Sequence, residues 1–287
     1  MTPPVRWPAE AVWEAVAPLL PGFTVEVLPT IDSTNTELMR RARAGQTEPT
    51  LLVAEEQTAG RGRLGRPWQS ASEHQGPLPS LMMSLGLPLA PRDWSGLSLA
   101  VGVSVAESLQ PTLPAAGSGV ARIGLKWPND LWLDGDRKLG GILVETASFV
   151  APQSGPAPDG AQAPRYVVVG IGLNVLPRSG EGMTMPPGCL QDIDSEWDAP
   201  TALLRIVPPL VGMLQSFALY GFGPVQPRFD LRDVLRGRSV HLSDGQAGTA
   251  HGVGEDGALL VHTPQGMQAV TSSEISVRPA GHALPPA

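Results

Sequence analysis

The chain is poor in cysteine, in charge and in aromatic residues. Cys189 is the one cysteine among 287 residues, so no disulfide can form within the chain and a disulfide-stapled scaffold is excluded. Charged residues make up 16% and hydrophobic residues 42% of the sequence, which predicts a well-supplied core and a sparsely charged surface. No run approaches the roughly 18 apolar residues of a membrane span, and Glu10 and Glu14 interrupt the segment where a secretion signal would stand. We therefore predict a cytoplasmic protein that does not enter a membrane.

Positive charge and histidine are also scarce. The net charge of −7 disfavours a general attraction to nucleic acid or anionic membranes, so any site for a polyanion must be local. His241, His251 and His262 lie ten or eleven positions apart, which is not the compact spacing of metal ligands. We expect no metal site built from protein groups alone.

Hydrophobic periodicity divides the first part of the chain into helices and short strands. Helices are predicted over residues 9–20, 34–45, 95–109 and 198–217. Thr34 and Glu37 form the pattern of a capping box, and Ser95 and Asp198 are predicted to cap the third and fourth helices. Pro208-Pro209 should kink or break the fourth helix. Strands are predicted over residues 23–27, 51–54, 81–85, 122–126, 131–133, 139–144 and 166–170. This mixture of hairpins and helices predicts an α+β fold, a mixed sheet with helices on one face.

The pattern changes from Gly237 onward. Short β segments follow one another at residues 240–242, 248–253, 258–262 and 267–270, which predicts a small β-barrel. We expect a large domain over residues 1–235 and a small barrel with a C-terminal tail over residues 236–287.

A basic, glycine-rich loop is the most distinctive local feature. Residues 60–66 read Gly-Arg-Gly-Arg-Leu-Gly-Arg, so backbone N–H groups and three guanidinium groups can close together on a phosphate chain. The G-x-G-x-x-G spacing of a dinucleotide fold requires a helix at the last glycine, and Arg66-Pro67-Trp68 argues against one. No Walker P-loop sequence is present. Taken alone, the segment is equally typical of a flexible solvated loop, and RNA contact is a further interpretation.

Two further motifs lie at the ends of predicted strands. Lys126-Trp127-Pro128-Asn129-Asp130 leads into a turn, and the following hairpin can return Lys138 to the same neighbourhood. An isolated lysine and aspartate of this kind are equally typical of a surface ion pair. In Val169-Gly170-Ile171-Gly172-Leu173-Asn174-Val175, the glycines permit close approach of a ligand and Asn174 supplies an amide.

Five motifs in order carry a family resemblance. They are Asp32-Ser33-Thr34-Asn35, Gln57-Thr58-Ala59-Gly60-Arg61-Gly62-Arg63, Lys126-Trp127-Pro128-Asn129-Asp130, Lys138-Leu139-Gly140-Gly141-Ile142-Leu143 and Gly170-Ile171-Gly172-Leu173-Asn174-Val175. Together they closely resemble the biotin protein ligases, also called biotin–[acetyl-CoA-carboxylase] ligases. The resemblance runs from about residue 26 to 176 and, more loosely, through residues 228–279. It implies a class II synthetase-like catalytic domain, shared with lipoate ligases, and an SH3-like C-terminal barrel.

The resemblance implies a reaction in two steps. Biotin is activated with ATP and Mg²⁺ to biotinyl-5′-adenylate and pyrophosphate, and is then transferred to one lysine of a biotin carboxyl carrier domain. The carboxylate of biotin and the α-phosphate are both anionic, so cations must lower their repulsion. Mg²⁺ is expected on the phosphates, with Asp130 as the protein group nearest to it.

The resemblance also assigns residues to roles. Arg61, Asp130 and Lys138 would be catalytic, with Asp130 as the base for the acceptor amine, and Arg63 would retain the adenylate. The implied biotin site comprises Ser33, Thr34, Gln57, Gly60, Arg61, Arg63, Trp68, Lys138, Gly141 and Gly172. The implied ATP and adenylate site comprises Arg61, Arg63, Arg66, Lys126, Asn129, Lys138 and Asn174. Seen alone, Ser33 and Thr34 are more typical of a plain helix N-cap, and both roles are compatible.

The sequence departs from some members of the family. Only 31 residues precede Asp32, too few for the winged-helix domain that some members carry, so we expect no binding to operator DNA. Residues 73–80 differ from the usual short turn, and residues 151–164 look like an insertion. A homodimer formed by sheet extension is implied by the resemblance.

Two alternative functions are weaker. A lipoate ligase shares the fold, but the Gly-Arg-Gly-Arg and Lys-Trp-Pro-Asn-Asp motifs favour biotin. An RNA-binding module would need exposed aromatic residues between the arginines and a wide basic face. An aromatic content of 5% and a negative chain offer neither.

Overall fold

The computed structural model describes residues 5–68, 78–115, 117–148, 163–180, 185–243, 245–271 and 277–279. Most of the two unusual segments, 73–80 and 151–164, therefore lies outside the described residues. The longer helices are α1 (Ala9–Val16), α2 (Thr34–Arg43), α3 (Leu97–Leu109), α4 (Ala199–Tyr220) and α5 (Gln226–Asp230). The strands are β1 (Thr24–Ile31), β2 (Thr50–Gln57), β3 (Ser80–Leu89), β4 (Gly124–Lys126), β5 (Asp130–Leu133), β6 (Arg137–Ser148), β7 (Arg165–Asn174), β8 (Ser239–Leu242), β9 (Ala247–Val253), β10 (Leu259–Thr263), β11 (Gly266–Val270) and β12 (Val277–Pro279).

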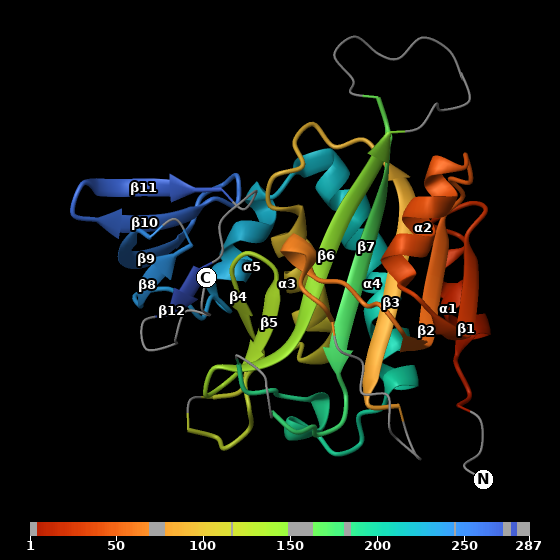
Figure 1. Cartoon of the computed structure of the whole chain (residues 1–287), viewed down its shortest axis with the longest axis horizontal. Helices are drawn as coiled ribbons and strands as arrows, with labels where there is room; N and C mark the ends of the chain where they lie inside the picture. Colours follow the sequence, from red (N-terminus) through yellow and green to blue (C-terminus); the bar gives the residue numbers. More distant parts are fainter. Residues whose placement is uncertain are drawn as a thin grey trace.

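A seven-stranded mixed sheet forms the centre of the large part, in the order β1-β2-β3-β7-β6-β5-β4 (Figure 1). The β1–β2 pair is parallel and all other neighbours are antiparallel. Leu51 and Val53 belong to the same core as α1, α3 and α4, whereas Leu52 packs with α2. Because side chains alternate between the faces of a strand, α2 lies on the face opposite the other three helices. The predicted mixed α+β sheet is confirmed, with its main helical layer on one face and α2 on the other.

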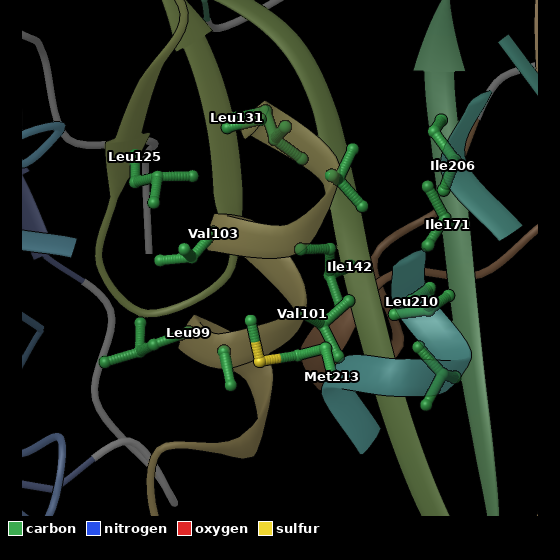
Figure 2. Close-up of a cluster of buried hydrophobic side chains, with 14 of the residues drawn as sticks. Leu99, Val101, Val103, Leu125, Leu131, Ile142, Ile171, Ile206, Leu210 and Met213 are labelled. Carbon is green, nitrogen blue, oxygen red and sulfur yellow. The ribbon is translucent and has the colours of Figure 1, made fainter. Parts of the chain in front are cut away.

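The larger core lies between the sheet and the pair of helices α3 and α4. Figure 2 shows Val101 of α3 beside Ile142 of β6, with Leu210 of α4 near Ile171 of β7. Each of these side chains is at most 3% exposed, and full burial of such a side chain contributes about 1.5–3 kcal/mol. This core fixes β6 and β7, the strands that later form the floor of the site.

Helix α4 is long and apolar enough to cross a membrane, with a mean hydropathy of 1.5 over 18 of its 22 residues. The prediction that no segment reaches this composition was therefore wrong. Half of that window is buried inside the protein, where α4 packs against α1, α3 and β3. Asp198 caps α4 as predicted, through a 2.7 Å bond from Thr201 N, but Pro208-Pro209 does not split the helix.

Two helix starts differ from the predicted caps. Ser33, rather than Thr34, is the N-cap of α2, and its Oγ accepts from Thr36 N at 3.4 Å. The predicted capping box of Thr34 with Glu37 is therefore wrong. Helix α3 begins after Gly96, whose φ of 78° is left-handed, so Ser95 is not its cap either. Ser33 is itself a preferred N-cap residue, so α2 begins one position earlier than predicted, whereas the close packing of Gly96 against Phe222 sets the start of α3.

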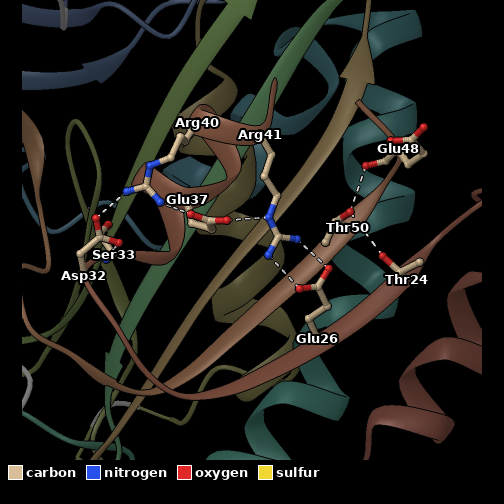
Figure 3. A network of polar contacts seen from close by, with 9 residues as sticks. All are labelled: Thr24, Glu26, Asp32, Ser33, Glu37, Arg40, Arg41, Glu48 and Thr50. Atoms are coloured by element: carbon tan, nitrogen blue, oxygen red, sulfur yellow. Dashed lines mark hydrogen bonds and ion pairs between the residues drawn. The ribbon is translucent and has the colours of Figure 1, made fainter. Parts of the chain in front are cut away.

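An arginine–carboxylate network fastens α2 to the edge of the sheet (Figure 3). Arg41 donates to both Glu26 oxygens, at 2.7 and 2.9 Å, and to Glu37 at 2.8 Å. Arg40 pairs with Asp32 and Glu37. The hydrogen bonds that Arg41 donates to Glu26 and Glu37 raise the pKa of Arg41, so it stays charged. Because Glu26 lies on β1 and Asp32 follows β1 directly, the network fixes the N-terminus of α2 beside the strand ends.

The last five strands form a separate antiparallel sheet in the order β11-β10-β9-β8-β12, which confirms the small C-terminal β structure. This sheet and the segment that leads into it are joined to the large part by several contacts, among them the two that follow. Residues 232–234 run along the outer edge of β4, where Leu125 N donates to Arg232 O at 2.7 Å and Val234 N to Leu125 O at 3.1 Å. The indole of Trp127, which is fully buried, donates to Gly257 O at 3.0 Å. The Lys126-Trp127-Pro128 segment is thus held in place by residues 232–234 beside it and by the turn at Gly257.

Asp233 lies at this junction and makes stability depend on pH. Its Oδ1 accepts from Leu235 N at 2.8 Å, while its Oδ2 is buried without a hydrogen-bond partner. Burial raises the pKa of Asp233 to about 6 from an ordinary value of 3.8. A raised pKa in the folded state means that the stabilising contribution is complete below about pH 4 and is lost as pH rises through about 6.

We expect Asp233→Asn to gain stability relative to the parent as pH rises, by about 1–3 kcal/mol between pH 4 and 8. Asparagine keeps the acceptor for Leu235 N and removes the buried charge. Urea unfolding at several pH values measures the difference. Asp256→Asn is the control, because Asp256 is exposed and makes the same kind of bond, to Ala258 N at 3.0 Å. A difference between parent and Asp233→Asn that stays constant with pH would contradict the prediction.

Candidate functional site

A cavity opens between the N-terminus of α2, the loop that follows β2, and strands β4 to β7. Its empty space, including solvent at the mouth, is about 1000 Å³. The lining includes most of the residues predicted for the site: Ser33, Thr34, Gln57, Arg61, Arg63, Arg66, Trp68, Lys126, Asn129, Asp130, Lys138, Gly141 and Gly172. Gly60 and Asn174 are the predicted residues that do not line it. Segments far apart in the sequence therefore converge as the motifs predict.

Glycines open the floor of the cavity. Gly172 of β7 pairs with Gly141 of β6, which pairs with Asp130 of β5. A Cβ atom on Gly172 would lie 2.6 Å from Cε2 of Trp68, so the absence of a side chain lets the indole ring lie against the sheet. The glycine motif thus makes room on this face, as its sequence predicts.

The basic loop is closed rather than extended. Gly62 N donates to Arg66 O at 2.7 Å, and Trp68 N donates to Gly60 O at 2.8 Å. A Cβ on Gly60 would lie 2.7 Å from Trp68 O, so Gly60 permits this closure although it does not line the cavity. The turn also places Leu64 in the left-handed region, with φ at 56°. The closed loop presents its three arginines to one cavity.

Lys138 and Asp130 face each other because of a β-bulge. The β5–β6 register shifts between Leu131 and Trp132, and such a shift turns a side chain to the other face. Lys138 Nζ then lies 2.8 Å from Asp130 Oδ1. The sequence predicted this convergence from the hairpin, but not the bulge that produces it.

The electrostatics of Asp130 argue against a role as base. Burial raises its pKa, but the charges of Lys138 and Lys126, the hydrogen bond from Lys138 and the charge of Arg63 outweigh burial, and the net pKa is lowered. A carboxylate with a lowered pKa is a weaker proton acceptor. Burial also lowers the pKa of Arg63, while Asp130 opposes that shift. The cluster acts as a set of cations arranged around one carboxylate.

The side-chain amides of Asn174 and Asn129, both predicted for the adenylate site, donate hydrogen bonds to backbone carbonyl oxygens. Asn174 is 4% exposed, and its Nδ2 donates to Lys138 O at 3.1 Å and Gly188 O at 2.9 Å. Asn129 Nδ2 donates to Ile142 O at 2.7 Å, although Asn129 does line the cavity. Asn174 therefore fixes the start of β6, beneath Lys138.

Thr34 and Gln57 are hydrogen-bonded to each other in the lining of the cavity. Gln57 Oε1 accepts from Thr34 N at 2.8 Å and from Thr34 Oγ1 at 3.2 Å. These bonds fix the direction of the Gln57 carboxamide. Ser33, Thr34 and Gln57 together form a neutral polar wall, while the arginines, Lys126 and Lys138 supply positive charge to the same cavity.

Three polar residues near the cavity escaped prediction from the sequence: Asn35, Ser84 and Glu145. Asn35 and Ser84 are 4% and 0% exposed, and Asn35 Nδ2 donates to Glu145 Oε2 at 3.0 Å. Ser84 stands in an apolar run, and Glu145 directly follows the strand predicted over residues 139–144, so neither is unusual locally. Only the sheet order, which places β3 and β6 on either side of β7, brings them together.

The residues that line the cavity include too few carboxylates to hold a magnesium ion by themselves, but they fit a magnesium ion that is bound mainly by the phosphates of ATP. Among the described residues, no group of three His, Cys, Asp or Glu side chains could hold a metal. Asp130 is the one carboxylate among the residues that line the cavity. A single carboxylate with phosphate oxygens is a common arrangement for Mg²⁺.

Comparisons with known proteins agree with this geometry. Residues 27–155 match the model of the Biotin/lipoate A/B protein ligase family, and residues 237–278 match that of the Biotin protein ligase C terminal domain. The bifunctional ligase/repressor BirA of Escherichia coli is 35% identical over 266 residues, which cover 91% of this chain and 76% of that protein. The biotin–[acetyl-CoA-carboxylase] ligase of Paracoccus denitrificans is 31% identical, over 85% of this chain and 96% of that protein.

A solved structure shares the fold along nearly its whole length. The biotin protein ligase of Aquifex aeolicus in complex with biotin and ATP superposes with a TM-score of 0.69 and 27% identity, covering 89% of this chain and 99% of that one. The family models, the identity to two named ligases and the shared fold therefore lead to one conclusion. The chain belongs to the biotin protein ligase family.

Proposed function

We propose that the protein activates biotin with ATP as biotinyl-5′-adenylate and transfers biotin to a lysine of a biotin carboxyl carrier domain. One observation carries this proposal: a single cavity is lined by neutral polar side chains, by an indole ring over a glycine floor and by several cations. Biotin has a polar ureido group, an apolar chain and a carboxylate, and each of these finds a matching surface in this lining. The ligase activity named for the Escherichia coli and Paracoccus relatives supports the proposal.

In the first step, a carboxylate oxygen of biotin attacks the α-phosphorus of ATP, and the bond from that phosphorus to the pyrophosphate oxygen breaks. Arg61, Arg63 and Lys138 reduce the repulsion between the two anions and stabilise the charge that develops on the phosphate. Mg²⁺, when bound, supplies further positive charge to the phosphate oxygens. Ser33, Thr34 and Gln57 give the ureido group fixed hydrogen-bond partners, which a buried polar group needs.

In the second step, a lysine amine of the carrier attacks the carbonyl carbon of the adenylate and AMP leaves. We propose that Asp130 contributes by holding Lys138, at 2.8 Å, rather than by accepting the proton of the amine. Its lowered pKa supports this assignment. Lys138 then remains directed toward the mixed anhydride through both steps.

Intact-mass spectrometry of a biotin carboxyl carrier domain tests the proposal. The carrier is incubated with the protein, biotin and Mg-ATP, and lipoate replaces biotin in a parallel reaction. We expect one added biotinyl group, absent without ATP. Lipoylation instead would assign the protein to the lipoate ligases, and failure of both transfer and adenylate formation would overturn the function.

We expect Arg63→Gly to release biotinyl-5′-adenylate into solution at least about tenfold faster than the parent. Arg63 lines the cavity from the closed loop, and a loop over a reactive anhydride limits its escape. Rapid filtration after formation of the adenylate measures release, with Arg63→Lys as the variant that keeps the charge. Equal release from Arg63→Gly and the parent would remove this role.

The remaining expectations belong to the same proposal. We infer a catalytic domain over residues 1–235 and a small domain over 236–287, and no operator binding by this chain. A homodimer by sheet extension is supported by β1, which is an edge strand of the large sheet and has no described strand along its outer side. A cytoplasmic location suits an enzyme that consumes ATP. Gel filtration tests the dimer.

A further inference from the structure

Glu145 lies on β6 outside the lining of the cavity, but it contacts an arginine inside it. Arg61 Nη2 donates to Glu145 Oε1 at 3.1 Å and to Oε2 at 3.0 Å. Within the described part of the chain, the Nε and Nη1 atoms of Arg61 make no further hydrogen bond. Glu145 thus fixes one nitrogen of the guanidinium and leaves the other two for a ligand.

The carboxylate of Glu145 is itself held by a hydrogen bond from Asn35. Asn35 Nδ2 donates to Glu145 Oε2 at 3.0 Å and to Leu143 O at 3.3 Å, and Asn35 Oδ1 accepts from Ser84 Oγ at 2.6 Å. Asn35 is 4% exposed, so movement of Glu145 would leave a buried amide with fewer partners. Glu145 is therefore a fixed group, and Arg61, with 44% of its side chain exposed, is the mobile one.

The strand register explains why this arrangement is rigid. Ser84 of β3 pairs with Gly170 of β7, and Gly170 pairs with Leu143 of β6. Asn35 lies over Gly170, where a Cβ atom would approach its Oδ1 to 2.1 Å. Residues of three neighbouring strands thus hold the side chain of Asn35 in place. Glu145 is two residues beyond Leu143 on β6.

The same contacts reach the neutral polar wall of the cavity. Ser84 Oγ lies 2.7 Å from Thr34 Oγ1, and Thr34 holds Gln57. A continuous chain of polar groups, buried at Thr34, Ser84 and Asn35, therefore connects Gln57 with the guanidinium of Arg61.

We propose that Glu145 is a positioning residue that directs Arg61 toward the phosphates of ATP. This inference rests on the proposed function, because it assigns a role within adenylate formation. A long, exposed arginine samples many rotamers. Fixing one of its nitrogens on a carboxylate that Asn35 holds in place orders the guanidinium before ATP binds, and preorganised charge is what stabilises a transition state.

Glu145→Gln in the full-length protein tests the proposal. Glutamine keeps the size of the side chain and an oxygen for Asn35 Nδ2, but it loses the ion pair with Arg61. We expect kcat/KM for ATP in adenylate formation to fall about tenfold, with biotin affinity within about twofold. Glu107→Gln is the matched control, because it removes a charge paired with Arg228, a residue outside the cavity lining, and should change neither quantity.

A double-mutant cycle with Arg61→Ala separates positioning from a general loss of structure. If Glu145 acts through Arg61, Glu145→Gln should have no further effect on kcat/KM when Arg61 is already alanine. An equal loss in both backgrounds, or no loss in the parent background, would overturn the proposal. Absence of biotinyl-5′-adenylate from the unmodified protein would instead refute the proposed function, so the two failures are distinguishable.

Discussion

Replacement of Lys138 by alanine is expected to lower the rate of biotinyl-5′-adenylate formation by about 10²–10³-fold, the loss seen when one preorganised charge-stabilising group is removed. Biotin affinity should change by less than about threefold, because the neutral wall around Thr34 and Gln57 stays intact. Lys138 Nζ is directed into the cavity by the β-bulge and held by Asp130 at 2.8 Å. Pyrophosphate release measures the rate, and calorimetry measures biotin binding.

Loss of Lys138 also leaves Asp130 without its ion-pair partner, and an unpaired, largely buried charge destabilises a protein. The double variant Lys138→Ala, Asp130→Asn removes that charge and keeps the test valid. Lys126→Ala is a useful comparison, since Lys126 lines the same cavity from β4. Normal adenylate formation in folded Lys138→Ala would remove Lys138 from the mechanism.

The second large effect is expected from Gly170→Ala, which should lower the free energy of unfolding by about 2–4 kcal/mol. Overpacking a buried site costs about 1–3 kcal/mol, and the displaced Asn35 loses hydrogen bonds as well. The new Cβ would lie 2.1 Å from Asn35 Oδ1 and 2.8 Å from Asn35 Cγ. Asn35 cannot move away, because it is bound to β3 and β6. Urea unfolding monitored by circular dichroism measures the change.

Gly172→Ala is the matched control on the same strand and face. Its Cβ would lie 2.6 Å from Trp68, a side chain that belongs to a surface loop and can swing away. We expect a smaller loss of stability than for Gly170→Ala, but a clear loss of biotin affinity because the indole would lie over the cavity differently. Equal destabilisation by the two substitutions would show that the hydrogen bonds of Asn35 do not prevent it from moving away from the new Cβ atom.

Much of the site could be predicted because its motifs carry their chemistry locally. A loop of alternating glycine and arginine has few uses, and a hairpin that begins at Asp130 and returns at Lys138 must bring its two ends together. The strands could be located from their apolar runs for the same reason, but their ends could not, since β3 continues through Gly86 and Pro88 and β7 through Gly170 and Gly172. These properties depend on neighbours in the sequence.

The features that could not be predicted depend on pairing between distant segments. Ser84 and Glu145 become neighbours of Asn35 only once β3, β7 and β6 are placed side by side. Asn174 was predicted to lie beside the adenylate, but the segment at Gly188 takes its amide. Gly96 starts α3 where Ser95 was predicted to cap it, because Gly96 is packed against Phe222. Local propensity does not contain such contacts.

The seam between the two sheets also matters for anyone who wishes to shorten this enzyme or to exchange its C-terminal part. Residues 232–234 pair with Leu125, and the carbonyl of Gly257 receives the indole proton of Trp127. A cut near residue 236 would strip Trp127 of that acceptor and leave a buried donor unsatisfied within the segment that carries Lys126 and Asp130. The C-terminal part therefore cannot be removed without affecting the site. A C-terminal domain exchanged from a relative would have to reproduce the turn at Gly257 to keep Lys126, Asp130 and Lys138 in their present arrangement.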